Sequence, residues 1–170
     1  YAPLLTWAAH PVCFIMMFLL IPIWESFYFY WIHRFLHIPF LYKHVHALHH
    51  RNINVGPWSG LSMHPVEHVI FLGSVMIHWI IAAHPVHILF HLQYYALTAA
   101  TTHTGFEGVS IKDENRLVLG RFHHQMHHRY FECNYGSLEI PWDKFFGSFH
   151  DGTNEADKRM KERRKRMMGN

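Results

Sequence analysis

Three short histidine-rich segments constrain what this chain can fold into more than any other feature of the sequence. They are His33-x-x-x-His37, His46-x-x-His49-His50 and His124-x-x-His127-His128. On a helix, residues i, i+3 and i+4 share a face, so each histidine box directs two or three imidazoles the same way. Neutral imidazole is a ligand for iron, zinc, copper and nickel, and one metal ion takes at most about six ligands. The eight histidines of these boxes therefore predict two metal ions.

Three apolar runs predict membrane-spanning helices. Residues 11–32 are long enough to cross a bilayer, which takes roughly 20 mainly apolar residues. Residues 66–82 and 86–103 are also apolar, and His84-Pro85 separates them because the residue before a proline disfavours helix. We therefore expect a helical hairpin that turns at residues 83–85. Glu25 in the first run is costly in lipid unless it faces protein or water, so we assign it a contact inside the bundle.

The distribution of charge predicts an orientation. All 15 Lys and Arg lie within residues 34–51, 112–144 and 158–166. The first run ends at the first box, and the hairpin leaves and returns to that side before the third box, so all three boxes share one side with the basic residues. The positive-inside rule makes that side cytosolic. The predicted fold class is all-α: an integral membrane helical bundle with a cytosolic, histidine-rich di-metal cap. The alternative is a soluble helical protein with a very apolar core.

We expect a single membrane domain over residues 1–154 and a basic C-terminal tail over residues 155–170, helical from 155 to 168. The tail is either a solvated end or a contact for anionic lipid headgroups. The two cysteines, Cys13 and Cys133, form no CxxC motif and predict no disulfide scaffold. No nucleic-acid partner is expected.

Several segments together resemble a known family. HRFLH, HALHH and HQMHH, with the tail NYGSLEIPWDKFFGSF, resemble the fatty acid hydroxylase superfamily and, within it, the sterol desaturase branch. GPWSGLSMHPVEH and THTGFEG resemble the His-Pro and His-Gly elements of that branch. The similarity extends over roughly residues 24–152. The resemblance implies an integral membrane, di-metal, O2-dependent lipid oxidase that either hydroxylates or desaturates its substrate.

The resemblance also implies ten metal ligands. To the eight histidines of the boxes it adds His64, from the His-Pro element, and His103, from the His-Thr-Gly element. The full set is His33, His37, His46, His49, His50, His64, His103, His124, His127 and His128. His68 shares a helix face with His64 and is left open as a further ligand, although it lies one turn deeper, roughly 6 Å along the axis.

Other polar residues are expected to support or surround the metals. Glu67, Glu107 and His123 are candidates for orienting ligand imidazoles. His87 and His91 also have i, i+4 spacing, but His91 precedes His103 by roughly 18 Å on one helix, which places it away from the metals. We assign these two and His78 to polar contacts inside the bundle or near the outer interface.

Two iron ions are the expected cofactor and O2 the cosubstrate, because zinc, which can occupy the same ligands, is not redox-active. The expected substrate is a lipid, either a sterol or a fatty acyl chain, that reaches the site from the bilayer. The sequence shows no dinucleotide, haem or iron–sulfur motif, so we expect a separate electron donor of the ferredoxin or cytochrome b5 type, attracted by the basic face. The expected location is the bacterial inner membrane or the endoplasmic reticulum, with the active site facing the cytosol.

A second class of function remains open: a membrane metal-binding or transport protein without redox catalysis. A transporter is expected to line its histidines along a span rather than gather them at one side. A zinc hydrolase is expected to carry an HExxH motif, which this sequence lacks.

Overall fold

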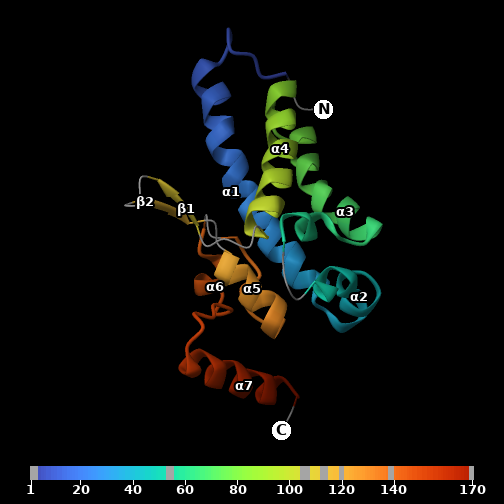
Figure 1. Cartoon of the computed structure of the whole chain (residues 1–170). Coiled ribbons are helices and arrows are strands. Elements are labelled where there is room, and N and C mark those ends of the chain that lie inside the picture. The colour runs from blue at the N-terminus through green and yellow to red at the C-terminus, as the bar shows by residue number, and fades with distance from the viewer. Residues whose placement is uncertain are drawn as a thin grey trace.

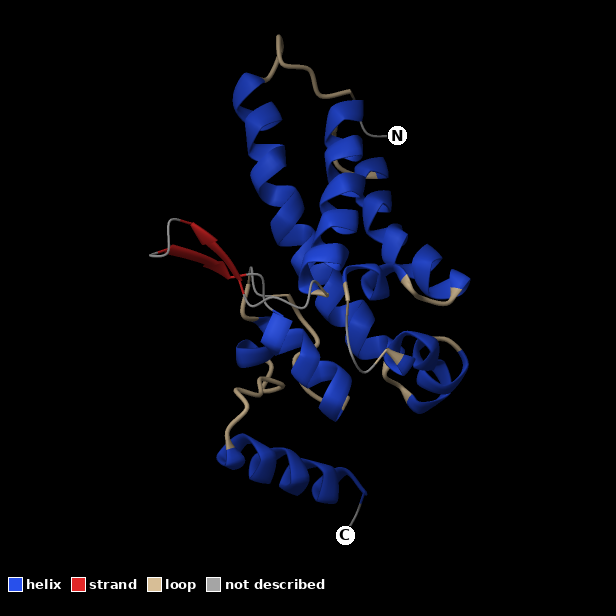
Figure 2. Cartoon of the chain, viewed as in Figure 1, coloured by secondary structure: helices blue, strands red, loops and turns tan. Residues whose placement is uncertain are grey.

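A computed structural model describes residues 4–52, 56–103, 108–111, 115–118, 121–137 and 140–168. The described chain is mainly helical (Figure 2). Long helices run side by side in one half of the molecule, and shorter helices gather around their ends in the other half (Figure 1). The site lies where the two halves meet.

The first helix, α1 (Pro11–Leu36), crosses the length of the bundle without a break at Pro22. It begins with Pro11 in its first turn, where a missing N–H costs no hydrogen bond. Among the described helices, it alone is long and apolar enough to cross a membrane. The first apolar run thus forms the helix that the sequence predicted.

The predicted hairpin also forms, with one difference. Its second arm is α4 (Pro85–Thr102), but its first arm is α3 (Pro65–Leu72) continued by a 3-10 helix, η3 (Gly73–Trp79). The change of helix type falls where the Tyr28 hydroxyl donates to the Ile70 carbonyl at 2.7 Å. A Cβ at Gly73 would lie 2.7 Å from that hydroxyl, so the glycine permits α1 and α3 to approach closely. Residues 66–82 are therefore not one membrane-length α-helix.

The short helices form a cap at the ends of α1 and α4. They are α2 (Pro39–His44), η1 (His46–Arg51), η2 (Pro57–Leu61), α5 (Arg121–Tyr130) and α6 (Trp142–Phe145). The second histidine box lies on η1, a 3-10 helix, in which side chains at i and i+3 eclipse. His46 and His49 accordingly stack, with ring centroids 5.4 Å apart.

The all-α prediction missed one hairpin. Strands β1 (Gly108–Ile111) and β2 (Asn115–Val118) pair antiparallel, with Gly108 opposite Val118. The β-branched residues Val109, Ile111 and Val118 favour extended backbone in a segment too short for a stable helix. The predicted helical tail is confirmed as α7 (Asn154–Met168), which lies apart from the bundle (Figure 1).

The bundle is apolar outside and partly polar inside. Large apolar side chains are exposed along α1 and along the hairpin: Ile15, Leu19, Ile23, Phe27, Trp79, Ile80, Leu89 and Leu97. The buried positions instead include Glu25, Ser74, His78, His87 and His91. Extended exposed apolar surface marks contact with a membrane or another protein. The outer face of α1 and the hairpin is therefore a candidate surface for contact with a membrane or another protein.

We predict that Leu19→Arg prevents stable membrane insertion of α1. Leu19 is 61% exposed near the middle of the helix, where an arginine costs about 2.5–3.5 kcal/mol in lipid. The measurement is the fraction of chain that resists extraction from membranes, with Leu19→Phe as the control. In a water-soluble protein the same exposed arginine would change stability by less than about 0.5 kcal/mol, and extraction would not differ between the variants.

Candidate metal centre

Nine histidines gather into two groups in which each residue offers one nitrogen. Within a group these nitrogens all lie within 4.8 Å of one another. The first group is His33, His37, His46, His50 and His127; the second is His49, His103, His124 and His128. They come from the end of α1, from η1, from the end of α4 and from α5, segments far apart in the sequence.

In the first group, three hydrogen bonds fix which ring nitrogen carries the proton. His33 Nδ1 lies 2.7 Å from the Tyr135 carbonyl, and His127 Nδ1 lies 2.7 Å from the Cys133 carbonyl. His46 Nδ1 lies 2.6 Å from Glu67 Oε1. Carbonyls and carboxylates accept hydrogen bonds, so each of these Nδ1 atoms donates. The Nε2 atom of each ring is then a bare lone pair.

Two of these lone pairs, on His127 and His46, lie close to ring nitrogens of further histidines. His37 Nε2 lies 3.1 Å from His127 Nε2, and His50 Nε2 lies 3.0 Å from His46 Nε2. The buried His33 Nε2 has no hydrogen-bond partner in the described structure. One nitrogen from each of the five rings lies within 4.8 Å of the others, and three of these rings carry a bare Nε2 lone pair. The donor set therefore fits a metal ion.

The second group has the same construction. His103 Nδ1 donates to the Ala99 carbonyl at 2.8 Å, which leaves its Nε2 bare. That atom lies 2.8 Å from His124 Nε2, which in turn lies 3.1 Å from His128 Nε2. The two groups touch, because the ring centroids of His50 and His128 are 4.7 Å apart. Two neighbouring metal ions can therefore be held, one by each group.

Burial keeps these imidazoles neutral. It lowers the pKa of His103 to about 4, although the hydrogen bond to the Ala99 carbonyl favours the charged form. Burial, reinforced by His103, lowers the pKa of His128 to about 3. The pKa values of His49, His124 and His127 lie well below the ordinary value, through burial first and neighbouring imidazoles second. Neutral imidazole is the form that binds a metal.

A buried carboxylate, Asp143, organises the loop that supplies the two carbonyls to His33 and His127. Its Oδ1 accepts from the Tyr135 N–H at 2.9 Å and from the Ser148 hydroxyl at 2.6 Å, and its Oδ2 accepts from the Gly136 N–H at 2.8 Å. Burial raises the pKa of Asp143, but the contact with His123 and these hydrogen bonds outweigh it and bring the pKa below its ordinary value. Asp143 is not among the residues predicted from the sequence, although it lies in the NYG…WD segment that carries the resemblance.

The structure describes two of the three residues predicted to orient ligand imidazoles. Glu67 Oε1 lies 2.6 Å from His46 Nδ1, and its orienting role stays a prediction. His123 Nε2 lies 3.3 Å from Asp143 Oδ2, so any influence it has on the ligand imidazoles passes through that carboxylate. Glu107 lies outside the described residues.

His64 is the member of the predicted set that neither group includes. It is the N-cap of α3, where its Nδ1 accepts from the Val66 N–H at 3.2 Å. His68 also lies outside both groups, with its Nε2 3.1 Å from the Leu61 carbonyl. The structure therefore brings together nine of the ten predicted ligands.

The histidines deeper in the bundle lie outside both groups. His78 Nε2 and His91 Nδ1 are 3.1 Å apart, and His87 Nε2 lies 3.0 Å from the Phe14 carbonyl. His91 also contacts Glu25, which gives Glu25 the bundle contact assigned to it from the sequence.

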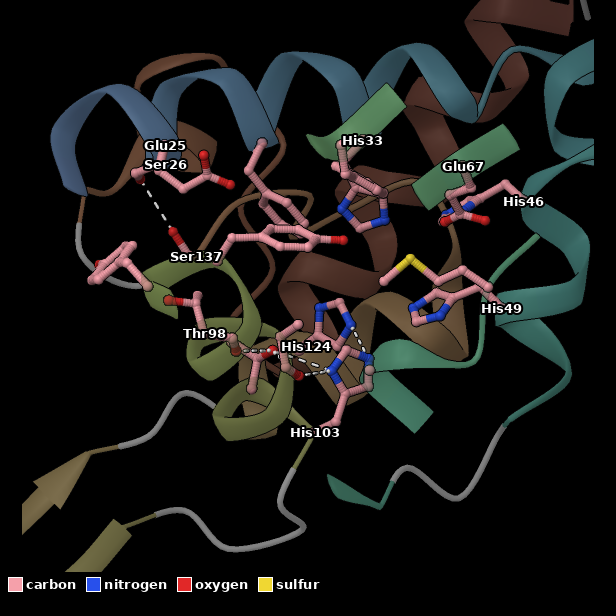
Figure 3. Close-up of a pocket in the computed structure, with 18 residues that line it drawn as sticks. Glu25, Ser26, His33, His46, His49, Glu67, Thr98, His103, His124 and Ser137 are labelled. Atoms are coloured by element: carbon pink, nitrogen blue, oxygen red, sulfur yellow. Dashed lines mark hydrogen bonds and ion pairs between the residues drawn. The ribbon is translucent and has the colours of Figure 1, made fainter. Parts of the chain in front are cut away.

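A pocket opens between the histidine groups and the bundle (Figure 3). About 560 Å³ of space lies between its lining atoms, counting the open mouth. Apolar walls come from Phe29, Met63 and Phe71. Five of the nine grouped histidines line it: His33, His46, His49, His103 and His124. A bound molecule would therefore lie directly against both groups.

A helical bundle that gathers nine neutral imidazoles beside an apolar pocket defines a candidate histidine-ligated two-metal protein. Comparison with known proteins identifies the family. Residues 17–148 match the family model for fatty acid hydroxylase, so the chain belongs to that family. Its relatives place it in the sterol desaturase branch.

Three relatives illustrate the similarity. Delta(7)-sterol 5(6)-desaturase ERG3B of Gibberella zeae is 32% identical over 130 residues, 75% of this chain and 40% of the relative. Lathosterol oxidase of Rattus norvegicus is 35% identical over 128 residues, 71% and 40% of the two chains. Putative Delta(7)-sterol-C5(6)-desaturase 2 of Arabidopsis thaliana is 33% identical over 141 residues, 81% and 49%. The matched region thus spans less than half the length of these relatives. No solved structure matches the chain.

We predict that Asp143→Asn loosens the metal site from a distance. The variant places an amide where three groups donate hydrogen bonds, and losing a buried hydrogen bond to a charged group costs about 1.5–3 kcal/mol. Metal affinity should fall about 10–100-fold, as for other partners that orient ligands. Titration of the metal-free protein with Fe(II) measures this. The control is Asp151→Asn, an exposed carboxylate bonded to Thr153, and equal affinities in both variants would contradict the role of Asp143.

We also predict that His64→Ala retains the full metal content of the wild-type protein. The substitution removes an N-cap, which lowers the free energy of unfolding by about 1 kcal/mol, but removes no member of either group. Metal analysis of the purified variant tests this, with His68→Ala as the matched histidine on the same helix. Loss of a metal ion from His64→Ala alone would restore His64 to the ligand set.

Proposed function

We propose that the chain carries the catalytic core of a membrane-bound, di-iron, O2-dependent lipid oxidoreductase that hydroxylates or desaturates a C–H bond of a sterol or fatty acyl substrate. The observation that carries the proposal is the convergence of nine imidazoles on two adjacent points beside an apolar pocket, with the Nδ1 proton of four of the rings held by a carbonyl or carboxylate. Family membership and the sterol desaturases among the relatives support the same class of reaction.

Iron is the metal that suits this role. Imidazole ligands accept iron and zinc alike, but zinc has no redox chemistry, so it would serve only as a substitute in a purified sample. His33, His37, His46, His50 and His127 would hold one ion, and His49, His103, His124 and His128 the other. A bound pair of irons supplies O2 activation and the oxidising power to attack an unactivated C–H bond.

The protein's own part is to hold ligands and substrate. Glu67 and the carbonyls of Cys133, Tyr135 and Ala99 keep the Nδ1 protons in place, so that the Nε2 lone pairs remain free. The apolar pocket walls bind the hydrocarbon skeleton of the substrate and exclude water from the reacting C–H bond. The exposed apolar surface of α1 and the hairpin would sit in lipid, from which a substrate can enter.

Location and electron supply follow from charge. We place the histidine cap on the cytosolic side, because the basic residues lie on the cap side of the bundle. The family allows either the bacterial inner membrane or the endoplasmic reticulum. A separate ferredoxin or cytochrome b5-type protein would deliver electrons, and electrostatic steering by the basic face favours such a partner.

The alternative is a membrane metal-binding or transport protein. Both groups of ligating histidines lie at one end of α1 and α4, whereas a transport path requires ligands along the spans. The histidines deeper in the bundle bond to one another, to Glu25 and to a backbone carbonyl, and none belongs to a metal-binding group among the described residues. The arrangement favours catalysis over transport.

We predict that His49→Ala and His128→Ala each lose bound iron and oxidise neither a Δ7-sterol nor a fatty acyl lipid. Loss of a residue that only orients a ligand lowers activity about 10–100-fold. Removing a ligand itself should reduce turnover by more than that. Iron content and product formation with O2 and a reduced carrier are the measurements. The matched control is His87→Ala, a buried imidazole outside both groups, which should keep its iron. Full turnover in either ligand variant would contradict the proposal.

A further inference from the structure

A line of buried polar side chains runs through the bundle toward the pocket. Three elements supply it: Glu25 comes from α1, His78 from η3 and His91 from α4. Glu25 is 3%, His78 8% and His91 0% exposed. Acidic and histidine side chains inside a membrane bundle are costly, and chains of them mark proton relays. The proposed function gives these three residues no role.

The hydrogen bonds along this line all point the same way. His91 Nε2 lies 2.8 Å from Glu25 Oε2 and 3.2 Å from Ser74 Oγ, and His91 Nδ1 lies 3.1 Å from His78 Nε2. Because a carboxylate accepts, His91 donates from Nε2, and its bare Nδ1 then accepts from His78 Nε2. The Nδ1 of His78 is in turn left bare; it is buried and makes no hydrogen bond within the described chain. Each imidazole therefore directs its proton toward Glu25.

The line joins two pockets. Glu25 lines the pocket beside the histidine groups, and Figure 3 shows it on one side with His46 and His49 on the other. At the other end, His78 lines a second pocket between α1 and η3, which holds about 390 Å³ including its opening. A water molecule takes about 30 Å³ in the liquid, so this space admits water. His78 lies one residue before the end of η3, so the second pocket is near the hairpin turn, at the end of the bundle away from the cap.

We propose that His78, His91 and Glu25 form a proton relay, which carries protons from the outer end of the bundle to the pocket beside the histidine groups. The proposal rests on the proposed function, because oxidation of a C–H bond by O2 consumes protons. Substrate, O2, two electrons and two protons give an alcohol and one water, or an alkene and two waters. The one-electron carrier supplies the electrons. A reacting site enclosed by apolar walls needs a separate route for the protons.

Each passage moves one proton and leaves no net charge on a ring. A proton binds His78 Nδ1 as the Nε2 proton of that ring passes to His91 Nδ1. The Nε2 proton of His91 then passes to Glu25, whose carboxylate becomes a carboxylic acid. Glu25 releases this proton into the pocket and is a carboxylate again. Rotation of the two rings restores the starting arrangement.

Inside the pocket, water completes the path. Glu25 precedes His33 by eight residues on α1 (33 − 25), which is about 12 Å along the helix axis and too far for direct transfer. The Tyr95 hydroxyl lines the same pocket, is buried and makes no hydrogen bond within the described chain. Buried polar groups without a protein partner are usually bonded to ordered water. A water bonded to Tyr95 would carry the proton on from Glu25.

The competing role for the line is structural, since its hydrogen bonds also hold α1, η3 and α4 together. His91→Gln separates the two roles. The amide of glutamine can donate to Glu25 and accept from His78, but it cannot pass a proton from one side to the other. His87→Gln is the matched control, because His87 is a buried imidazole one turn earlier on α4 that bonds to the Phe14 carbonyl, outside the line. Both variants should bind as much iron as the wild-type protein.

The first test asks from which side of the membrane the protons come. The iron-loaded full chain is placed in vesicles of phosphatidylcholine and a Δ7-sterol, which offer both substrate classes, with a pH-sensitive dye trapped inside. Reduced ferredoxin added outside cannot cross the membrane, so it serves only chains whose cap faces outward. In those chains His78 lies toward the interior, and the relay predicts that the interior becomes alkaline as product forms. Product formation with protons taken only from the external medium would overturn the proposal.

The variants assign the proton uptake to its residues. A positioned proton-transfer side chain contributes about 10²–10⁴-fold to a rate, so His91→Gln should slow the alkalinisation of the interior by about 100-fold or more. Glu25→Gln should have the same effect, because an amide cannot take up the proton. His87→Gln should match the wild-type protein. A wild-type rate of interior alkalinisation in His91→Gln, with its iron retained, would show that the line is only structural.

A second measurement needs neither metal nor turnover. Nitrogen-15 NMR of the metal-free full chain, with labelled histidines, shows which ring nitrogen carries the proton. We expect a proton on Nε2 and none on Nδ1 in both His78 and His91, with the signals assigned from His78→Gln and His91→Gln. A resting proton on His78 Nδ1 would overturn the relay, because the entry atom would then be occupied.

The two measurements also separate this proposal from the proposed function. The expected protonation in a chain that forms no product when loaded with iron would contradict the proposed function and leave the aligned hydrogen-bonded line standing. Product formation without alkalinisation of the interior would do the reverse.

Discussion

The site depends on where the proton sits on each imidazole. A histidine ring offers a metal only the nitrogen that carries no proton, and here the surrounding chain chooses that nitrogen. The carbonyls of Cys133, Tyr135 and Ala99 and the carboxylate of Glu67 each accept from Nδ1 of one histidine. The opposite nitrogens of His127, His46 and His103 then lie about 3 Å from the Nε2 atoms of His37, His50 and His124, an arrangement that a cation stabilises. The hydrogen bonds of the folded chain thus set which nitrogen each of these four rings offers to a metal.

The rest of the fold serves this arrangement. The α1 helix carries His33 at its end and Glu25 about two turns before it, so one rigid element sets the separation between the two ends of the pocket. The α4 helix brings His103 and Tyr95 to the same pocket from the other side. The loop after α5 is fixed by Asp143, which is how a residue outside the ligand set controls two ligand rings. Apolar side chains cover the outside of α1 and the hairpin, and polar side chains such as Glu25 and His91 lie inside the bundle.

Sequence periodicity predicted what depends on local spacing. The i, i+4 pairs on α1 and α5 form as expected, because a helix fixes which side chains share a face. The second box behaves differently, since η1 is a 3-10 helix and spacing within six residues does not distinguish it from an α-helix. The β-hairpin of residues 108–118 was missed for a related reason, because its strands are four residues each.

What sequence could not supply were contacts between distant segments. His64 matched a family element, yet in the fold its ring caps α3. Asp143 and the carbonyl of Cys133 can position ligand rings only because the loop that carries them lies against the end of α1 in the folded chain. The contact of Glu25 with His91 joins residues that are 66 positions apart in the sequence, and no local sequence pattern predicts it.

Iron stoichiometry tests the central claim most directly. The full chain, reconstituted anaerobically with Fe(II) and freed of loosely bound metal, is analysed for iron per chain. The convergence of nine neutral imidazoles in two groups predicts two irons per chain. A reproducible value of one iron or none would contradict it.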